Sequence, residues 1–122
     1  MQTILLIGHG SRSAAAREEF LSTAEKLEQT TGLVVKPAFM ELAQPSIQAS
    51  VEELYRSGSR TIRVVPLFLY NGIHIQEDIP EILNGLKDKY AGISFEMGGH
   101  IGSHPLLVQI LKERCGEVCR TI

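Results

Sequence analysis

The chain has 122 residues, 43% of them hydrophobic and 6% aromatic, and its 12 basic and 14 acidic side chains give a net charge of −2. This length fits one domain, residues 1–122, with a modest core. The sequence contains no cluster of Lys and Arg, which disfavours a nucleic-acid-binding protein, because that affinity depends on concentrated positive charge. No apolar run approaches the roughly 20 residues that a membrane-spanning helix needs.

The first residues, MQTILLIGHGSR, contain a short apolar run with no basic region before it and no cleavage-site pattern after it. We therefore expect no secretory signal. Cys115 and Cys119 stand late in the chain and form no disulfide framework. One turn apart on a helix they could present two sulfur ligands, although two free thiols are the simpler interpretation. These features predict a cytoplasmic protein.

Apolar runs and amphipathic stretches alternate four times along the chain. The runs at residues 3–7, 33–40, 61–69 and 93–97 are predicted strands. Residues at helical spacing fill the stretches between them, from Ser13 to Thr31, from Pro45 to Gly58, from Asp78 to Tyr90 and from Pro105 to Val118. The pattern predicts an α/β fold, a single three-layer sandwich with a four-stranded parallel sheet and helices packed on its faces.

Two details refine this prediction. Pro37 lies inside the second predicted strand, and a fully paired central position would not tolerate it. Asp78 and Glu81 resemble a capping box at the start of the third helix, so Asp78 is interpreted as its N-cap.

Candidate residues of a functional site follow each predicted strand. They are His9, Gly10, Ser11 and Arg12 after the first, Glu41 after the second, Gly72 and His74 after the third, and His100 and His104 after the fourth. In parallel sheets ligands bind beyond the carboxyl ends of the strands. All four histidines are therefore expected on one rim, whatever the strand order.

Histidine exchanges a proton near neutral pH and also binds cobalt, iron and nickel. A carboxylate such as Glu41 could orient an imidazole, accept a proton or complete a metal's coordination shell. The glycines around His9 allow a bulky ligand to approach the backbone closely. This combination predicts a metal-handling or proton-transfer site.

Each residue also has a purely structural interpretation. His9 could cap the first helix or bond a backbone carbonyl, and His74 could be a loop histidine without a role. Glu41 taken alone is more often a surface or capping carboxylate. His100 and His104 could simply shape the rim, with His104 at the start of the last helix.

Two arginines near the first strand have similar alternatives. Arg12 and Arg17 could each bind a ligand carboxylate, since a guanidinium pairs with it bidentately. Arg17 could instead only solvate its helix.

Four segments carry a family resemblance: LLIGHGSR, FMEL around Glu41, PLFLYNGIHIQEDIP, and the late GSHP. In order and spacing they resemble the CbiX family of sirohydrochlorin chelatases, over most of the chain from Leu5 to about Leu107. The element GxHxxxDIP, from Gly72 to Pro80, is the most specific of them.

The resemblance implies a sirohydrochlorin cobaltochelatase, with Fe²⁺ or Ni²⁺ as alternatives to Co²⁺ and no organic cofactor. His9 and His74 would bind the metal and take protons from the pyrrole nitrogens, with Glu41 as the nearby acidic group. The implied substrate-binding residues are Gly10, Ser11, Arg12, Gly72 and His104. Larger relatives are two-lobed, so this single lobe is expected to act as a homodimer, with two rims as the walls for one macrocycle.

Two other functions are compatible with parts of the pattern. A histidine phosphatase also has His-Gly after its first strand, but those enzymes place an Arg before the His, and Gly8 stands here. A non-enzymatic carrier of metal or tetrapyrrole would use the same residue types as a chelatase.

Overall fold

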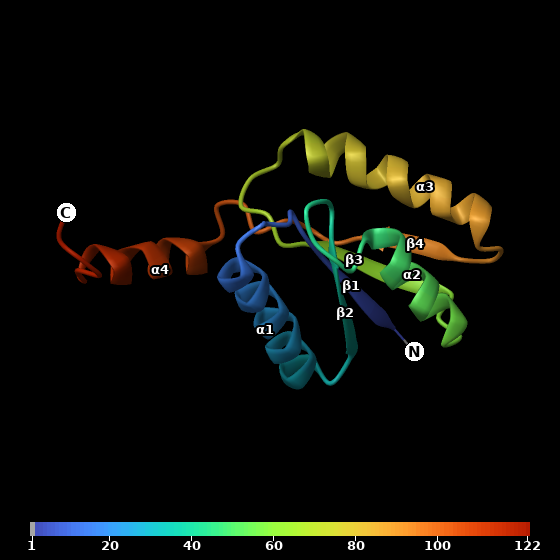
Figure 1. Cartoon of the computed structure of the whole chain (residues 1–122), viewed down its shortest axis with the longest axis horizontal. Helices are drawn as coiled ribbons and strands as arrows, with labels where there is room; N and C mark the ends of the chain where they lie inside the picture. Colours follow the sequence, from blue (N-terminus) through green and yellow to red (C-terminus); the bar gives the residue numbers. More distant parts are fainter. Residues whose placement is uncertain (1) are drawn as a thin grey trace.

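The computed structural model describes residues 2–122, except for the side chain of His74. Four parallel strands form one sheet in the order β2-β1-β3-β4 (Figure 1). They are β1 (Thr3–Gly8), β2 (Val34–Phe39), β3 (Thr61–Pro66) and β4 (Ser94–Met97). The helices are α1 (Ala14–Thr31), α2 (Ile47–Arg56), the π-helical turn η1 (His74–Asp78), α3 (Ile79–Lys89) and α4 (Pro105–Cys115). The predicted α/β fold is confirmed.

Two apolar clusters occupy the two faces of the sheet. Leu5 and Ile7 of the central strand β1 pack in the cluster that contains residues of α2 and α3. Ile4 and Leu6 point to the opposite face and pack in the cluster that contains residues of α1. Every residue of β1 is buried, as expected for a strand whose two faces are both covered. The long apolar run at the start of the chain therefore reflects a central strand.

Strand β2 lies at an edge of the sheet, which explains why Pro37 is tolerated within it. Pro37 is in register with Leu6 of β1. Its carbonyl accepts a hydrogen bond of 2.7 Å from the hydroxyl of Ser50 on α2, and Ser50 is fully buried. This bond ties α2 to the edge strand.

Ser50→Ala is expected to lower the free energy of unfolding by about 1 to 3 kcal/mol, because the Pro37 carbonyl loses this donor inside the protein. The matched control is Ser57→Ala, which removes an exposed hydroxyl that bonds the Glu53 carbonyl. Its effect should stay within about 0.5 kcal/mol. Urea unfolding followed by circular dichroism compares the two, and equal shifts would contradict this assignment.

The ends of α1 and the start of α2 are set by side-chain and glycine caps. Ser13 caps α1 by accepting a hydrogen bond from the Ala16 amide, and Gly32 ends the helix with a φ of 71°. The prediction that Pro45 opens α2 was wrong. The helix begins at Ile47, because the side chain of Ser46 accepts from the Ala49 amide and makes Ser46 the N-cap.

The region after β3 departs furthest from the prediction. β3 ends at Pro66 rather than at residue 69. Asp78 stands at the N-cap position of α3, as predicted, but the predicted capping box with Glu81 was wrong. Asp78 already has helical backbone angles and makes no side-chain cap hydrogen bond, because η1 runs directly into α3.

Helix α4 differs from the other helices because none of its residues is buried. Figure 1 shows it extending away from the sandwich, on the side of the view where α1 begins. The expectation that helices pack on the sheet therefore holds for α1, α2 and α3 but not for α4. The helix also ends before Val118 and Cys119, so the two cysteines, both exposed and free, do not share a helix. None of the described helices is long and apolar enough to cross a membrane.

Candidate functional site

The carboxyl ends of β1 and β2 bring His9 and Glu41 together. His9 Nε2 lies 3.1 Å from Glu41 Oε1, and the two side chains are 49% and 55% exposed. A carboxylate at this distance fixes both the orientation and the tautomer of an imidazole. Because both groups remain about half exposed, a ligand can reach them.

The backbone around this pair continues the ladder between β1 and β2. The Met40 amide donates to the Gly8 carbonyl at 2.9 Å, and the Glu41 amide donates to the His9 carbonyl at 3.2 Å. These two bonds place the backbones of His9 and Glu41 side by side, so the two side chains start from adjacent positions.

Gly10 makes this close approach possible. Its φ is +108°, and a Cβ added there would lie 1.7 Å from the Glu41 carbonyl oxygen. No side chain fits at that distance, and L residues rarely adopt that φ. Glycine at position 10 is therefore a requirement of the His9–Glu41 geometry, and it gives a physical reason for the HGS sequence.

The loop that follows is held by Arg17 and Ser11. Arg17 Nη1 donates to the Ser11 carbonyl at 3.1 Å, and Ser11 Oγ accepts from the Ser13 amide at 3.0 Å. Arg17 therefore supports the loop from α1 and does more than solvate its helix. Arg12 lies exposed in the same loop, where it can reach a ligand.

His74 is the first residue of η1, and its side chain lies outside the described residues. The carbonyl of Gly72 accepts hydrogen bonds from the amides of Ile75 and Gln76, at 3.2 and 3.1 Å. Gly72 itself is exposed. These two hydrogen bonds to the Gly72 carbonyl therefore connect the loop after β3 to the first turn of η1.

Phe68 is a residue of this region that the sequence interpretation missed. Its ring centroid lies 6.1 Å from that of His9, with the two ring planes tilted by 55°. The signal was present in the run PLFLYNG, but its first four residues, 66–69, were interpreted as part of β3. Because β3 ends at Pro66, Phe68 belongs to the rim and contributes an apolar wall beside the imidazole.

The other two histidines form a separate part of the rim. His104 caps α4, with its Nδ1 accepting from the Leu106 amide at 3.1 Å, as expected for the residue before Pro105. His100 and His104 line a hollow of about 350 Å³, and the remaining lining side chains are the apolar ones of Ile101, Leu106, Leu107 and Ile110. The expected rim is therefore divided between a His9–Glu41 pair and a more apolar region at the start of α4.

The described residues of a single chain contain no group of three or more His, Cys, Asp or Glu side chains that could hold a metal ion. His9 and Glu41 together supply two side chains of this kind. A fuller coordination shell therefore needs ligands from outside this set.

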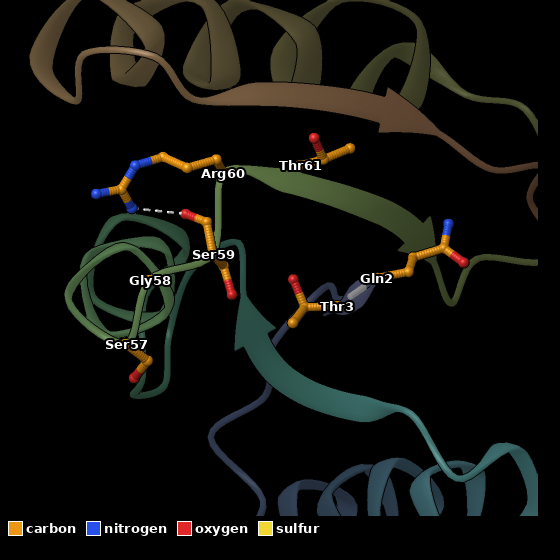
Figure 2. A pocket seen from close by; sticks show the side chains of 7 residues that line it. All are labelled: Gln2, Thr3, Ser57, Gly58, Ser59, Arg60 and Thr61. Carbon is orange, nitrogen blue, oxygen red and sulfur yellow. Dashed lines mark hydrogen bonds between the residues drawn. The ribbon is translucent and has the colours of Figure 1, made fainter.

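A larger hollow, of about 480 Å³, lies at the opposite edge of the sheet, where β1 and β3 begin (Figure 2). Its described lining contains no His, Cys, Asp or Glu. The guanidinium of Arg60 is engaged by the carbonyls of Tyr55 and Ser59, and it also stacks on the Tyr55 ring at 3.7 Å. Because ligands of such sheets bind at the carboxyl ends, we place the functional site at the rim with His9.

Comparison with known proteins gives consistent matches. The profile of the CbiX family matches residues 3–118. A sirohydrochlorin cobaltochelatase of Methanococcoides burtonii is 35% identical over 124 residues, which cover 94% of this chain and 95% of that protein. The chloroplastic sirohydrochlorin ferrochelatase of Arabidopsis thaliana is 33% identical over 114 residues, covering 91% of this chain and 50% of that protein.

A solved structure also matches closely. It is the sirohydrochlorin chelatase SirB from Bacillus subtilis subspecies spizizenii in complex with cobalt, with a TM-score of 0.91 and 32% identity. The match covers 98% of this chain and 51% of SirB. The chain thus spans about half the length of several relatives that it matches.

Proposed function

The chain belongs to the CbiX family, and from this premise we propose that it is a chelatase that inserts a divalent metal ion into sirohydrochlorin. The proposal is supported by the relatives that are named sirohydrochlorin chelatases. Within this structure, the observation that supports the proposal is the half-exposed His9–Glu41 pair at the carboxyl edge of the sheet.

The reaction exchanges one divalent metal ion for two pyrrole N–H protons, so the site must deliver a metal and accept protons. A neutral imidazole can do both, because its ring lone pair binds borderline metals and also takes up a proton. When His9 Nε2–H donates to Glu41, the lone pair lies on Nδ1. We therefore assign metal delivery and proton acceptance to His9 Nδ1, and orientation of the ring to Glu41.

After a proton transfer the His9 imidazole is positive, and the adjacent Glu41 carboxylate stabilises that charge at 3.1 Å. The second pyrrole proton needs a second base. We assign this role, and a second metal-binding nitrogen, to His74, which stands in the specific GxHxxxDIP element.

The remaining rim residues are assigned to the macrocycle. We assign the exposed Arg12 to pair with a substrate carboxylate. Ser11 and Gly72 are assigned to contact the macrocycle, since a Cβ added at Gly72 would meet nothing within 4 Å. Gly10 acts through the close approach of its backbone to Glu41. His104, at the start of α4, borders the apolar hollow that would accept part of the ring.

The metal substrate is a divalent first-row ion, and no organic cofactor is invoked. The named relatives include both cobaltochelatases and ferrochelatases. We rank Co²⁺ ahead of Fe²⁺ and Ni²⁺, because the Methanococcoides burtonii cobaltochelatase matches this chain along nearly its whole length.

We further propose that residues 1–122 form one lobe of a homodimer. A flat macrocycle needs two walls, and a single rim supplies one. If the rims of two chains face each other across a two-fold axis, a second His9–Glu41 pair lies opposite the first. The second pair would supply the metal ligands that one chain lacks. The cytoplasmic location stays a prediction from the sequence.

A turnover measurement separates a chelatase from a carrier that uses the same residues. Sirohydrochlorin and Co²⁺ are both supplied in large excess over the protein, anaerobically, and the absorbance of the macrocycle is followed. A chelatase converts many equivalents, whereas a carrier stops near one equivalent per site. The second outcome would replace the chelatase proposal with the carrier. Hydrolysis of an aryl phosphate would instead indicate the phosphatase.

Glu41→Gln is expected to lower the rate of metal insertion by about 10- to 100-fold, because the amide keeps the shape of the side chain but removes its charge beside the imidazole. The control Glu25→Gln removes an exposed carboxylate on α1 and should leave the rate unchanged. The initial rate of cobalt insertion checks both. An unaffected Glu41→Gln protein would show that the carboxylate charge is not used.

A further inference from the structure

Leu42 is the one residue other than glycine with a positive φ, of 64°, in the part of the chain that the structure describes. A bulky L residue rarely adopts this conformation, because its Cβ comes too close to the following carbonyl oxygen. Glycine and asparagine adopt it at little cost and are the usual residues of such turns. The turn alone therefore does not explain a leucine at position 42.

Packing in the interior does not offset this strain. The Leu42 side chain is 52% exposed, and it belongs to neither of the two apolar clusters that cover the sheet. Its neighbours differ, because Met40 packs against one cluster and Ala43 against the other. Strained residues gather at binding and catalytic sites, where the strain is part of the function. The strain at Leu42 therefore indicates that its side chain makes a contact outside the folded chain.

Leu42 stands at the rim that carries the His9–Glu41 pair. It follows Glu41 directly, and the Glu41 amide donates to the His9 carbonyl at 3.2 Å. Figure 1 shows this loop, between β2 and α2, beside the end of the central strand β1. Leu42 is therefore one residue away from the carboxylate that lies 3.1 Å from the His9 imidazole.

A second group of exposed apolar side chains stands on the other side of His9. Because the strand order is β2-β1-β3, the loops after β2 and after β3 flank the loop after β1. The loop after β3 contains Leu69, Tyr70 and Ile73, whose side chains are 46%, 72% and 59% exposed. His9 therefore lies between two loops that each expose apolar side chains.

We propose that Leu42 is a binding residue for the macrocycle, packed against the apolar face of the ring while His9 reaches its nitrogens. The inference rests on the proposed chelatase function and adds a residue to the same site. A flat ring with carboxylates at its edge needs apolar contacts for its faces and cations for its edge, and the rim offers Leu42 and Arg12. Covering the ring also excludes water from the imidazole, which strengthens electrostatic interactions there.

Two substitutions at position 42 separate the side chain from the backbone strain. Leu42→Gly removes both, so the protein without ligand should unfold at a urea concentration no lower than the native protein does. Leu42→Ala keeps a Cβ at positive φ and should unfold at a lower urea concentration than Leu42→Gly. Both variants should weaken the binding of metal-free sirohydrochlorin about 3- to 10-fold, since each loses the burial of roughly half a leucine side chain. A fluorescence titration measures this affinity.

Two further variants serve as controls. Leu42→Met keeps an apolar side chain of similar volume and should bind the macrocycle within about twofold of the native affinity. Leu21→Ala shortens a leucine of α1 that is 39% exposed, and it should leave the affinity unchanged. Native affinity in Leu42→Gly would overturn the proposal. A Leu42→Gly protein that unfolds at a lower urea concentration than the native one would make Leu42 a structural residue and would also overturn it.

Sedimentation of Leu42→Gly tests the other occupant of this surface, which is a second copy of the chain. The association state should equal that of the native protein, and weaker association would assign Leu42 to a contact between copies and overturn the proposal. A native protein that binds no sirohydrochlorin would overturn this inference together with the proposed function. Metal insertion by the native protein, with unchanged macrocycle affinity in Leu42→Gly, would overturn the inference alone.

Discussion

His9→Ala is expected to slow cobalt insertion into sirohydrochlorin by about 10²- to 10⁴-fold, the range in which a positioned proton-transfer group contributes to catalysis. The substitution removes the lone pair assigned to metal delivery and proton acceptance, and it leaves the Glu41 carboxylate without its partner at 3.1 Å. The affinity for the metal-free macrocycle should change far less, because we assign its carboxylates and ring to other parts of the rim. Initial rates and a fluorescence titration measure the two quantities.

The control for this variant is Lys26→Ala, an exposed change on α1 that should leave both quantities unchanged. A His9→Ala protein that turns over normally would remove His9 from the mechanism. Equal losses of rate and of macrocycle affinity would instead make His9 a binding residue without a role in the proton and metal exchange.

Gly10→Ala is expected to have the second largest effect, although it adds only a methyl group. That group would lie 1.7 Å from the Glu41 carbonyl oxygen, so the backbones that carry His9 and Glu41 must separate. Metal insertion should fall by about 10²-fold or more, because displacement of catalytic groups by 1 Å costs about that much. The free energy of unfolding should also fall.

Gly32→Ala is the matched control for the stability effect. Gly32 also has a positive φ, of 71°, but a Cβ there would meet nothing within 4 Å. It carries only the conformational cost of a left-handed residue, about 1 to 2 kcal/mol. Gly10→Ala should cost about 1 to 3 kcal/mol more, from overpacking against backbone. If the two variants unfold at the same urea concentration and both retain full activity, the close approach at Gly10 is not required.

The sequence predicted the sheet well because hydrophobic periodicity reports burial directly. The uninterrupted apolar run of β1 indicated a strand covered on both faces, and Pro37 indicated that β2 could not be central. The strand end at Pro66 could not be predicted from the run PLFLY, because a rim loop that packs against the site is as apolar as a strand. The cap at Ser46 was missed because Pro45 is also a common first residue of a helix.

The site was predicted in part for an equally simple reason. The carboxyl ends of parallel strands share one edge, so His9 and Glu41 had to lie on the same rim. Their 3.1 Å contact depends on the φ of Gly10 and on the ladder between the Glu41 amide and the His9 carbonyl, which no spacing rule specifies. Phe68 was missed along with the end of β3.

Helix α4 illustrates a limit of periodicity. Its apolar residues Leu107, Ile110 and Leu111 recur at helical spacing, and the pattern correctly predicts a helix. Periodicity specifies that an apolar face must be covered but not which surface covers it. In this chain that face is exposed.

The most direct test of the proposed activity is the initial rate of metal insertion as a function of protein concentration. Sirohydrochlorin is mixed anaerobically with Co²⁺, Fe²⁺ or Ni²⁺ in separate series, and the absorbance change is followed with and without the native protein. The proposal predicts rates that rise in proportion to the protein concentration, well above the protein-free rate, with cobalt fastest. Rates equal to the protein-free rate for all three metals, with tight binding of the macrocycle, would contradict it and indicate a carrier.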